Sequence, residues 1–156
     1  MNPDHTKRIK SLVEETLLKL QIPGEVEVLE HEEFPQFVIR SREAGILIGE
    51  GGQNLEALSH IVKKIAYKIL EPETKEGIFF SLDVNDYLAS KVEELKNMAK
   101  MNAQKVVYFK KAVEMDPMPA NERRIIHTFL TEHPNITTES VGEGENRRVI
   151  IKPYEI

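Results

Sequence analysis

Hydrophobic positions at the start of the chain predict one amphipathic helix followed by a hairpin. The helical pattern repeats at steps of three and four residues from Ile9 to Leu20 and ends before Pro23-Gly24. Residues 25–30 alternate apolar and polar side chains, which is the period of a half-buried strand. A polar turn at residues 31–33 leads into the apolar run Phe37–Arg40, so two antiparallel strands are expected here.

A glycine-rich segment then joins two helical patterns. The short apolar run Ala44–Ile48 predicts a short helix, and Gly49–Gly52 predicts a loop. The second helix is marked by one apolar face, which comprises Leu55, Leu58, Val62, Ile65 and Ile69. Pro72 is expected to end this helical region, and Gly77–Val84 reads as a third strand.

The rest of the chain predicts a second unit. A long helix, capped by Asn85 or Asp86, has an apolar stripe that continues to Val113, with no proline or glycine before Pro117. A helix at Ala120–Leu130 and strands at Ile136–Val141 and Arg147–Ile151 follow it. The expected fold is therefore α/β of the α+β type, with units at residues 1–84 and 85–156 joined by the long helix.

Composition narrows the possible functions. The 156 residues are 40% hydrophobic and 30% charged, which suits a folded core, and the absence of cysteine excludes disulfides, Cys-ligated metals and thiol nucleophiles. The net charge is −5, but residues 1–84 carry 10 basic and 15 acidic side chains while residues 85–156 carry 11 of each. The second half is thus the better candidate for electrostatic binding of nucleic acid. No signal peptide or apolar stretch of about 20 residues is present, so we expect a cytoplasmic protein without membrane insertion.

The glycine loop is the first candidate site. Glycines allow positive φ and close approach of a ligand, and the following helix offers free N–H groups to an anion such as phosphate. A Walker loop is excluded because no Gly-Lys-Ser/Thr follows, and a dinucleotide fingerprint starting at Gly49 would need glycine where Asn54 stands. On these residues alone, a purely structural turn remains the other interpretation.

The sequence Ile48-Gly49-Glu50-Gly51-Gly52 between two helices of a three-stranded α/β unit resembles a KH domain of type II, over roughly residues 1–84. The resemblance implies that the Gly-x-x-Gly loop clamps single-stranded RNA, with bases in a groove beside Leu55 and the strand Phe37–Ile39. It assigns nucleic-acid contacts to Ile48, Gly49, Glu50, Gly51, Gly52 and Leu55. Glu50 repels phosphate, so we expect weak or partner-dependent binding at this loop.

A basic cluster in the second half is the other candidate site. Arg123 and His127 are four residues apart and share one helical face, where a guanidinium and an imidazole can engage one phosphodiester. If the last strand converges with this helix, a single basic patch results. The candidate residues are Arg123, Arg124, His127, Arg147, Arg148 and Lys152.

The Arg-x-x-x-His spacing matches the signature of R-three-H single-strand nucleic-acid-binding domains. The stretch Met118–His127, followed by Thr137–Gly144 and Arg147–Pro153, resembles the Jag (SpoIIIJ-associated) family of bacterial proteins, which join a KH domain to this second domain. The resemblance implies cytoplasmic binding of single-stranded RNA, a link to cell elongation or envelope synthesis, and pairing with a small KH partner protein or a second copy. Many members carry an additional N-terminal domain and linker; this chain begins with the KH helix, so no role of that domain is expected here.

Other chemistry finds little support. Neither His31 with its neighbouring glutamates nor His127 with His133 has the spacing of a helical zinc site, and no serine lies in a nucleophile elbow. We therefore expect no metal, no cofactor and no enzymatic activity. The remaining alternative is a protein-interaction or dimerisation module whose acidic Gly-Glu-Gly-Gly loop has little affinity for nucleic acid.

Overall fold

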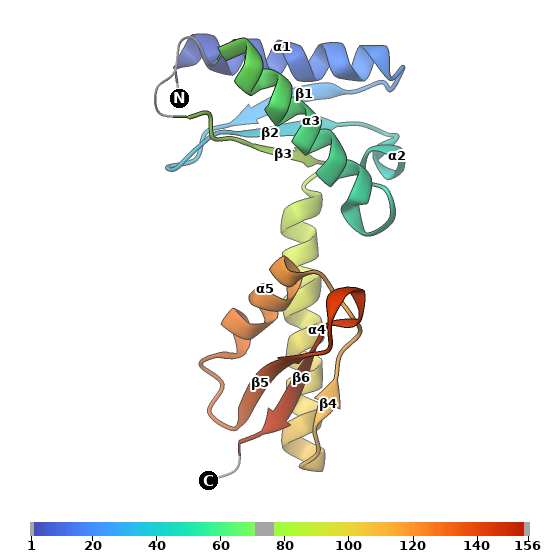
Figure 1. The fold of residues 1–156 in the computed structure, drawn as a ribbon, viewed down its shortest axis with the longest axis vertical. Helices are drawn as coiled ribbons and strands as arrows, with labels where there is room; N and C mark the ends of the chain where they lie inside the picture. The colour runs from blue at the N-terminus through green and yellow to red at the C-terminus, as the bar shows by residue number, and fades with distance from the viewer. Residues whose placement is uncertain (1, 71–76, 155–156) are drawn as a thin grey trace. The chain divides into compact units, whose positions relative to one another are not determined.

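The computed structural model describes residues 2–70 and 77–154 of the chain. The chain divides into two units, Met1–Leu88 and Ala89–Ile156, each with its own hydrophobic core. Helices and strands alternate in both units (Figure 1), which confirms the expected mixed α/β class.

The first unit has the element order helix, hairpin, short helix, helix, strand that the sequence predicts. Its elements are α1 (Pro3–Lys19), β1 (Glu25–Leu29), β2 (Gln36–Arg40), α2 (Ala44–Ile48), η1 (Glu50–Gly52), α3 (Gln53–Leu70) and β3 (Ser81–Val84). Strand β2 is central, antiparallel to β1 and parallel to β3. Strand β3 is shorter than predicted, and Pro72 lies outside the described residues.

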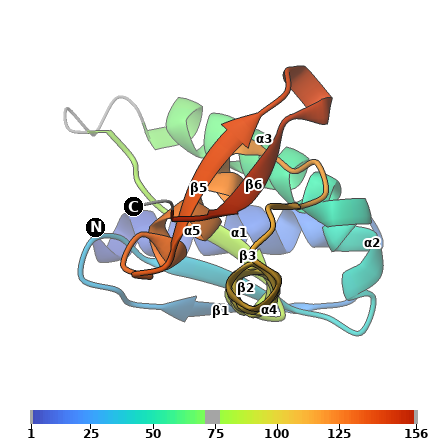
Figure 2. The same ribbon diagram turned by 90° about the horizontal axis from the view of Figure 1, so that it is seen from below.

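Helices α1 and α3 cover one face of this sheet (Figures 1 and 2). Ile9 and Val13 of α1 and Val62 of α3 are buried against Phe37 and Ile39 of β2. Full burial of an aliphatic or aromatic side chain of this kind contributes about 1.5–3 kcal/mol, so this layer dominates the stability of the unit. It also fixes where α2 and the glycine loop leave the sheet.

The connection from β3 to the next helix is stabilised by side chains rather than by glycine. Asn85 and Asp86 both have positive φ, 48° and 60°. The Asn85 side chain accepts a hydrogen bond from the Ser41 N–H at 3.1 Å and donates one to the Ser41 carbonyl at 2.8 Å. These two bonds offset the cost of the left-handed conformation and join this connection to the end of β2.

The expected helix cap is therefore wrong. The buried Asp83 carboxylate accepts from the N–H groups of Val84, at 2.7 Å, and Leu88, at 3.2 Å, while Asn85 is engaged with Ser41. Burial is the main cause that raises the pKa of Asp83 above its usual value. A carboxylate in the preceding strand thus caps the helix, which residue spacing alone did not indicate.

The second unit packs two helices against one face of a second antiparallel sheet. Its elements are α4 (Tyr87–Phe109, beginning at the end of the first unit), β4 (Val113–Glu114), α5 (Ala120–Leu130), β5 (Ile136–Val141), η3 (Gly144–Asn146) and β6 (Arg148–Pro153). Strand β6 lies between β4 and β5. Leu95 and Ala99 of α4 and Ile126 of α5 are buried with Val149 and Ile151 of β6.

The long helix ends earlier than its apolar stripe predicts. It stops at Phe109, Lys110 takes a positive φ of 55°, and Val113 pairs with Ile151 in the sheet. The stripe continues to Val113 because that side chain packs against the same core, from a strand instead of a helix. Tertiary strand pairing therefore overrides the local helical pattern.

Candidate functional site

The loop between α2 and α3 exposes backbone without side chains. Gly49, Gly51 and Gly52 have φ values of 71°, 59° and 86°, in the region that favours glycine. The N–H of Gly49 donates to the Gly45 carbonyl at 2.9 Å and ends α2. Helix α3 then begins at Gln53, directly behind the loop. This is the arrangement in which helix N–H groups and close backbone approach suit an anion.

The three glycines have different roles. A Cβ atom at Gly49 would lie 2.5 Å from Cγ of Asn54, whose amide donates to the Ile46 carbonyl at 2.8 Å. At Gly52 it would lie 3.0 Å from a ring carbon of Tyr87. At Gly51 it would meet nothing within 4 Å, and Gly51 is exposed. Gly49 and Gly52 therefore shape the loop, and Gly51 leaves its outer side open.

Glu50 gives this open loop a negative charge. It is exposed and makes no hydrogen bond or ion pair with any residue in the described ranges. A carboxylate about 4 Å from a phosphate repels it by roughly 1 kcal/mol in water. The geometry of the loop admits a phosphate, whereas its charge opposes one.

The apolar groove expected beside the loop is absent from this structure. Leu55 is only 3% exposed and lies in the core with Phe37 and Ile39, while Ile48 is half-buried. Strand β2 is central in its sheet, so its apolar side chains are consumed by packing. Leu55, Phe37 and Ile39 thus support the loop and offer no open surface to a base.

Sequence reasoning missed one exposed apolar side chain at the loop. Ile46 in α2 is 60% exposed. Its neighbour Leu47 is buried, because adjacent residues of a helix point in directions about 100° apart and cannot all face the core. The uninterrupted run Ala44–Ile48 contained that signal.

In the second unit, α5 places Arg123 and His127 beside strand β5. The two ring nitrogens of His127 lie 2.7 Å from Oγ1 of Thr138 and 2.8 Å from Oγ of Ser140. Burial is the first cause that lowers the pKa of His127, and the nearby charge of Arg123 is the second. His127 is therefore a neutral ring held between two hydroxyl groups at neutral pH, rather than a second free cation.

Arg123 is anchored but still has donors to offer. Its Nε atom donates to the Met118 carbonyl at 3.2 Å, and no bond from its Nη atoms to another described residue is found. The N–H of Met118 donates to the Arg147 carbonyl, also at 3.2 Å. The Arg147 side chain is exposed and unpaired within the described parts of the chain. Met118 thus holds the side chain of Arg123 close to the backbone of Arg147.

The structure does not bring Arg148 and Lys152 into this group. Val149 and Ile151 of β6 face the core beneath α5, so Arg148 and Lys152, which alternate with them, lie on the other face of the sheet. There Arg148 pairs with Glu114 at 2.8 Å, and Lys152 pairs with Glu139, whose pKa it lowers. The single basic patch expected from the last strand is therefore divided between two faces.

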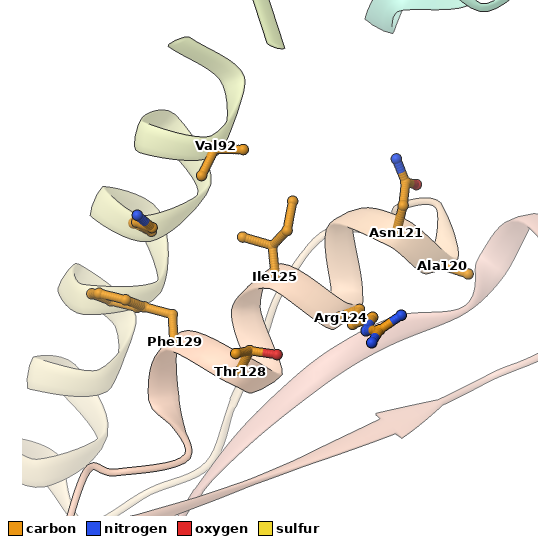
Figure 3. A pocket seen from close by; sticks show the side chains of 8 residues that line it. Val92, Ala120, Asn121, Arg124, Ile125, Thr128 and Phe129 are labelled. Carbon is orange, nitrogen blue, oxygen red and sulfur yellow. The ribbon is translucent and has the colours of Figure 1, made fainter. Parts of the chain in front are cut away.

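Arg124 occupies a third position. It lines a cleft of about 630 Å³ between α4 and α5, on a different side of α5 from His127 (Figure 3). The exposed Arg124 makes no ion pair or hydrogen bond with residues 2–70 or 77–154. The sites of Arg123 with Arg147 and of Arg124 are thus neighbouring but distinct.

Two further searches covered the described residues only. No three acidic or histidine side chains in them come close enough together to hold a metal ion. Likewise, none of their helices combines the length and the apolar character needed to cross a bilayer.

Comparisons with known proteins agree with this architecture. The KH domain family matches residues 8–110, and the R-three-H domain family matches residues 93–153. "RNA-binding protein KhpB" of Bacillus subtilis (strain 168) is 34% identical over 130 residues, which are 82% of this chain and 61% of the relative. The protein of the same name from Clostridium symbiosum is 34% identical over 134 residues, 86% of this chain and 59% of the relative.

A third relative, "RNA-binding protein KhpB" of Streptococcus pneumoniae serotype 2 (strain D39 / NCTC 7466), is 29% identical over 113 residues, 72% of this chain and 33% of the relative. The chain spans about three fifths of the length of the Bacillus and Clostridium relatives. Because its KH domain is followed by an R-three-H domain and these relatives match most of its length, the chain belongs to the KH domain family and, within it, to the Jag family.

Proposed function

We propose that this protein binds single-stranded RNA without changing it chemically. The observation that carries the proposal is the arginine pair at Met118. Arg123 is fixed through Nε with its Nη donors free, and Arg147 is exposed beside it. A guanidinium anchored in this way has lost little freedom still to be lost on binding phosphate. The relatives named RNA-binding protein, and both matched domain families, support this function over an enzymatic one.

The glycine loop is the second contact surface in this proposal. Gly51 is open to a sugar–phosphate backbone, and the N-terminus of α3 lies behind it. Glu50 weakens this contact, so the two surfaces together bind more tightly than either alone when one strand reaches both. Binding of single-stranded DNA, action on transcripts for cell elongation or envelope synthesis, and a cytoplasmic location are finer parts of the same proposal.

Two adjacent arginines provide a test with an internal control. Arg147→Gln removes an unpaired cation from the proposed surface, whereas Arg148→Gln removes one that Glu114 already pairs on the other face. In titrations of an unstructured RNA, Arg147→Gln should reduce the slope of log K against log salt by about 0.7, the value for one phosphate of a single strand. Arg148→Gln should change the slope much less. Equal effects, or a wild-type slope near zero, contradict RNA binding at this surface.

A second candidate function is a protein interaction through α3. Ile61, Ile65 and Ile69 recur every four residues on this helix and are all partly exposed. Such a stripe suits a small KH protein or a second copy of this chain. If it forms an interface, Ile65→Glu will shift the sedimentation of the complex to that of a monomer and leave the affinity for RNA unchanged.

A further inference from the structure

The cleft between α4 and α5 has an apolar floor with cationic edges. Ile125 and Phe129 reach from α5 toward Val92 of α4, and Phe129 is 41% exposed (Figure 3). Arg124 and Lys96 contribute the charged groups among its lining residues, which include no carboxylate. Its volume of about 630 Å³ lies within the range of clefts that hold small ligands.

The charges around the cleft favour an anionic occupant. Lys96 is partly neutralised by Glu93, with Nζ and Oε1 3.1 Å apart. Arg124 has no such partner anywhere in the described ranges. The cleft therefore carries one unsatisfied guanidinium beside an exposed aromatic ring. A phosphate and a base in one ligand complement these two groups.

The position of Arg124 connects this cleft with the proposed RNA surface. Arg123 and Arg124 are consecutive in α5, so their side chains leave the helix about 100° apart. A helix with its side chains is only about 10–12 Å wide, so a strand held by Arg123 can continue around α5 to Arg124. No turn of the nucleic acid away from the protein is needed.

We propose that the α4–α5 cleft, formed by Val92, Ile125 and Phe129 with Arg124 at its edge, receives one unpaired base of the bound RNA. The base stacks on the Phe129 ring, and Arg124 contacts the adjoining phosphate. This inference rests on the proposed function and adds to it the place where a base is held. Stacking on an aromatic ring tolerates all four bases, so the cleft adds affinity with little sequence preference.

The absence of tryptophan in the chain permits a direct test. Phe129→Trp introduces one fluorophore into the cleft while keeping an aromatic ring. Met101→Trp is the matched control, because Met101 is 60% exposed and follows Val92 by about two and a half turns, on the opposite side of α4. On addition of an unstructured RNA of mixed sequence, we expect quenching of the emission at position 129 and none at position 101.

A conservative variant measures what the stack contributes. Phe129→Leu keeps the cleft apolar but removes the ring, and it should weaken RNA binding at least about five-fold, the lower end for one base–aromatic stack. Arg124→Gln should lower the salt slope by about 0.7, with Arg148→Gln as its control. Circular dichroism will show that the variants keep their secondary structure.

The outcomes separate this inference from the proposed function. If wild-type protein binds RNA but the emission at position 129 or the affinity of Phe129→Leu is unchanged, the inference is wrong and the proposed function stands. That result leaves the cleft to an apolar segment of a protein partner. If wild-type protein fails to bind RNA at all, the proposed function fails and this inference fails with it.

Discussion

The Nε2 atom of His127 lies 2.8 Å from the Oγ atom of Ser140, and this contact joins α5 to β5 at the proposed RNA surface. The other ring nitrogen is used by Thr138 in the same strand. Because both ring nitrogens have partners in β5, the imidazole orients the two hydroxyl groups and supports Arg123 from one side. His127 is therefore a positioning residue in the proposed site.

The pH dependence of the second unit should report this arrangement. Burial and then Arg123 lower the pKa of His127 in the folded protein, so the neutral ring is favoured on folding. The resulting stability is present above the unfolded pKa of about 6.5 and is lost as the pH falls through the folded pKa. NMR titration of the ring proton should show the low pKa, and Arg123→Gln should raise it. Thermal unfolding of His127→Gln should lose less stability than wild type between neutral pH and pH of about 5. His60→Gln, which removes an exposed imidazole from the first unit, is the control.

The glycines of the loop should differ in their tolerance of alanine. Gly49→Ala forces a Cβ atom against Asn54 and disrupts its bond to Ile46, so we expect a loss of more than about 2 kcal/mol in unfolding free energy. Gly51→Ala meets no neighbour and should lose only the roughly 1–2 kcal/mol of left-handed strain. Chemical denaturation measures both values. Equal losses would show that Asn54 does not define the loop.

The charge of Glu50 should limit RNA affinity without affecting the fold. Glu50→Lys replaces repulsion by attraction at an exposed position, and a change of about 1–2 kcal/mol corresponds to roughly five- to thirty-fold tighter binding. Glu15→Lys, at an exposed position of α1, makes the same charge change as a control. Filter binding at low salt measures the difference. The same gain from both variants would reflect net charge alone, and no gain from Glu50→Lys would remove the loop from the RNA surface.

Asn85 should be important for stability although it is exposed. Asn85→Gly permits the positive φ but removes both hydrogen bonds to Ser41, so a loss of about 1–3 kcal/mol is expected. Asn85→Ala should lose more, since it also carries the left-handed strain. Differential scanning calorimetry can rank wild type, glycine and alanine variants. If the alanine variant is as stable as the glycine variant, strain at this position is negligible.

Local patterns predicted most of the elements. The helix Ala120–Leu130 was predicted to the residue, since an amphipathic period begins after Pro119 and reads clearly over three turns. The hairpin of β1 and β2 was predicted because its alternation is visible in single strands. The patterns failed where long-range contacts decide. The long helix stops at Phe109 because Val113 pairs with β6, and its cap is Asp83 because Asn85 binds Ser41.

By itself, the sequence determined the α/β class, the family motifs and which residue types are available to bind phosphate. Only the tertiary structure decided how those residues are grouped. It separated Arg147 from Arg148 and Lys152, buried Leu55 and enclosed His127 between two hydroxyl groups. The physical reason is that alternation in a strand specifies two faces but does not say which face a helix will cover. That choice depends on Val149 and Ile151 packing beneath α5, a contact between segments distant in the chain.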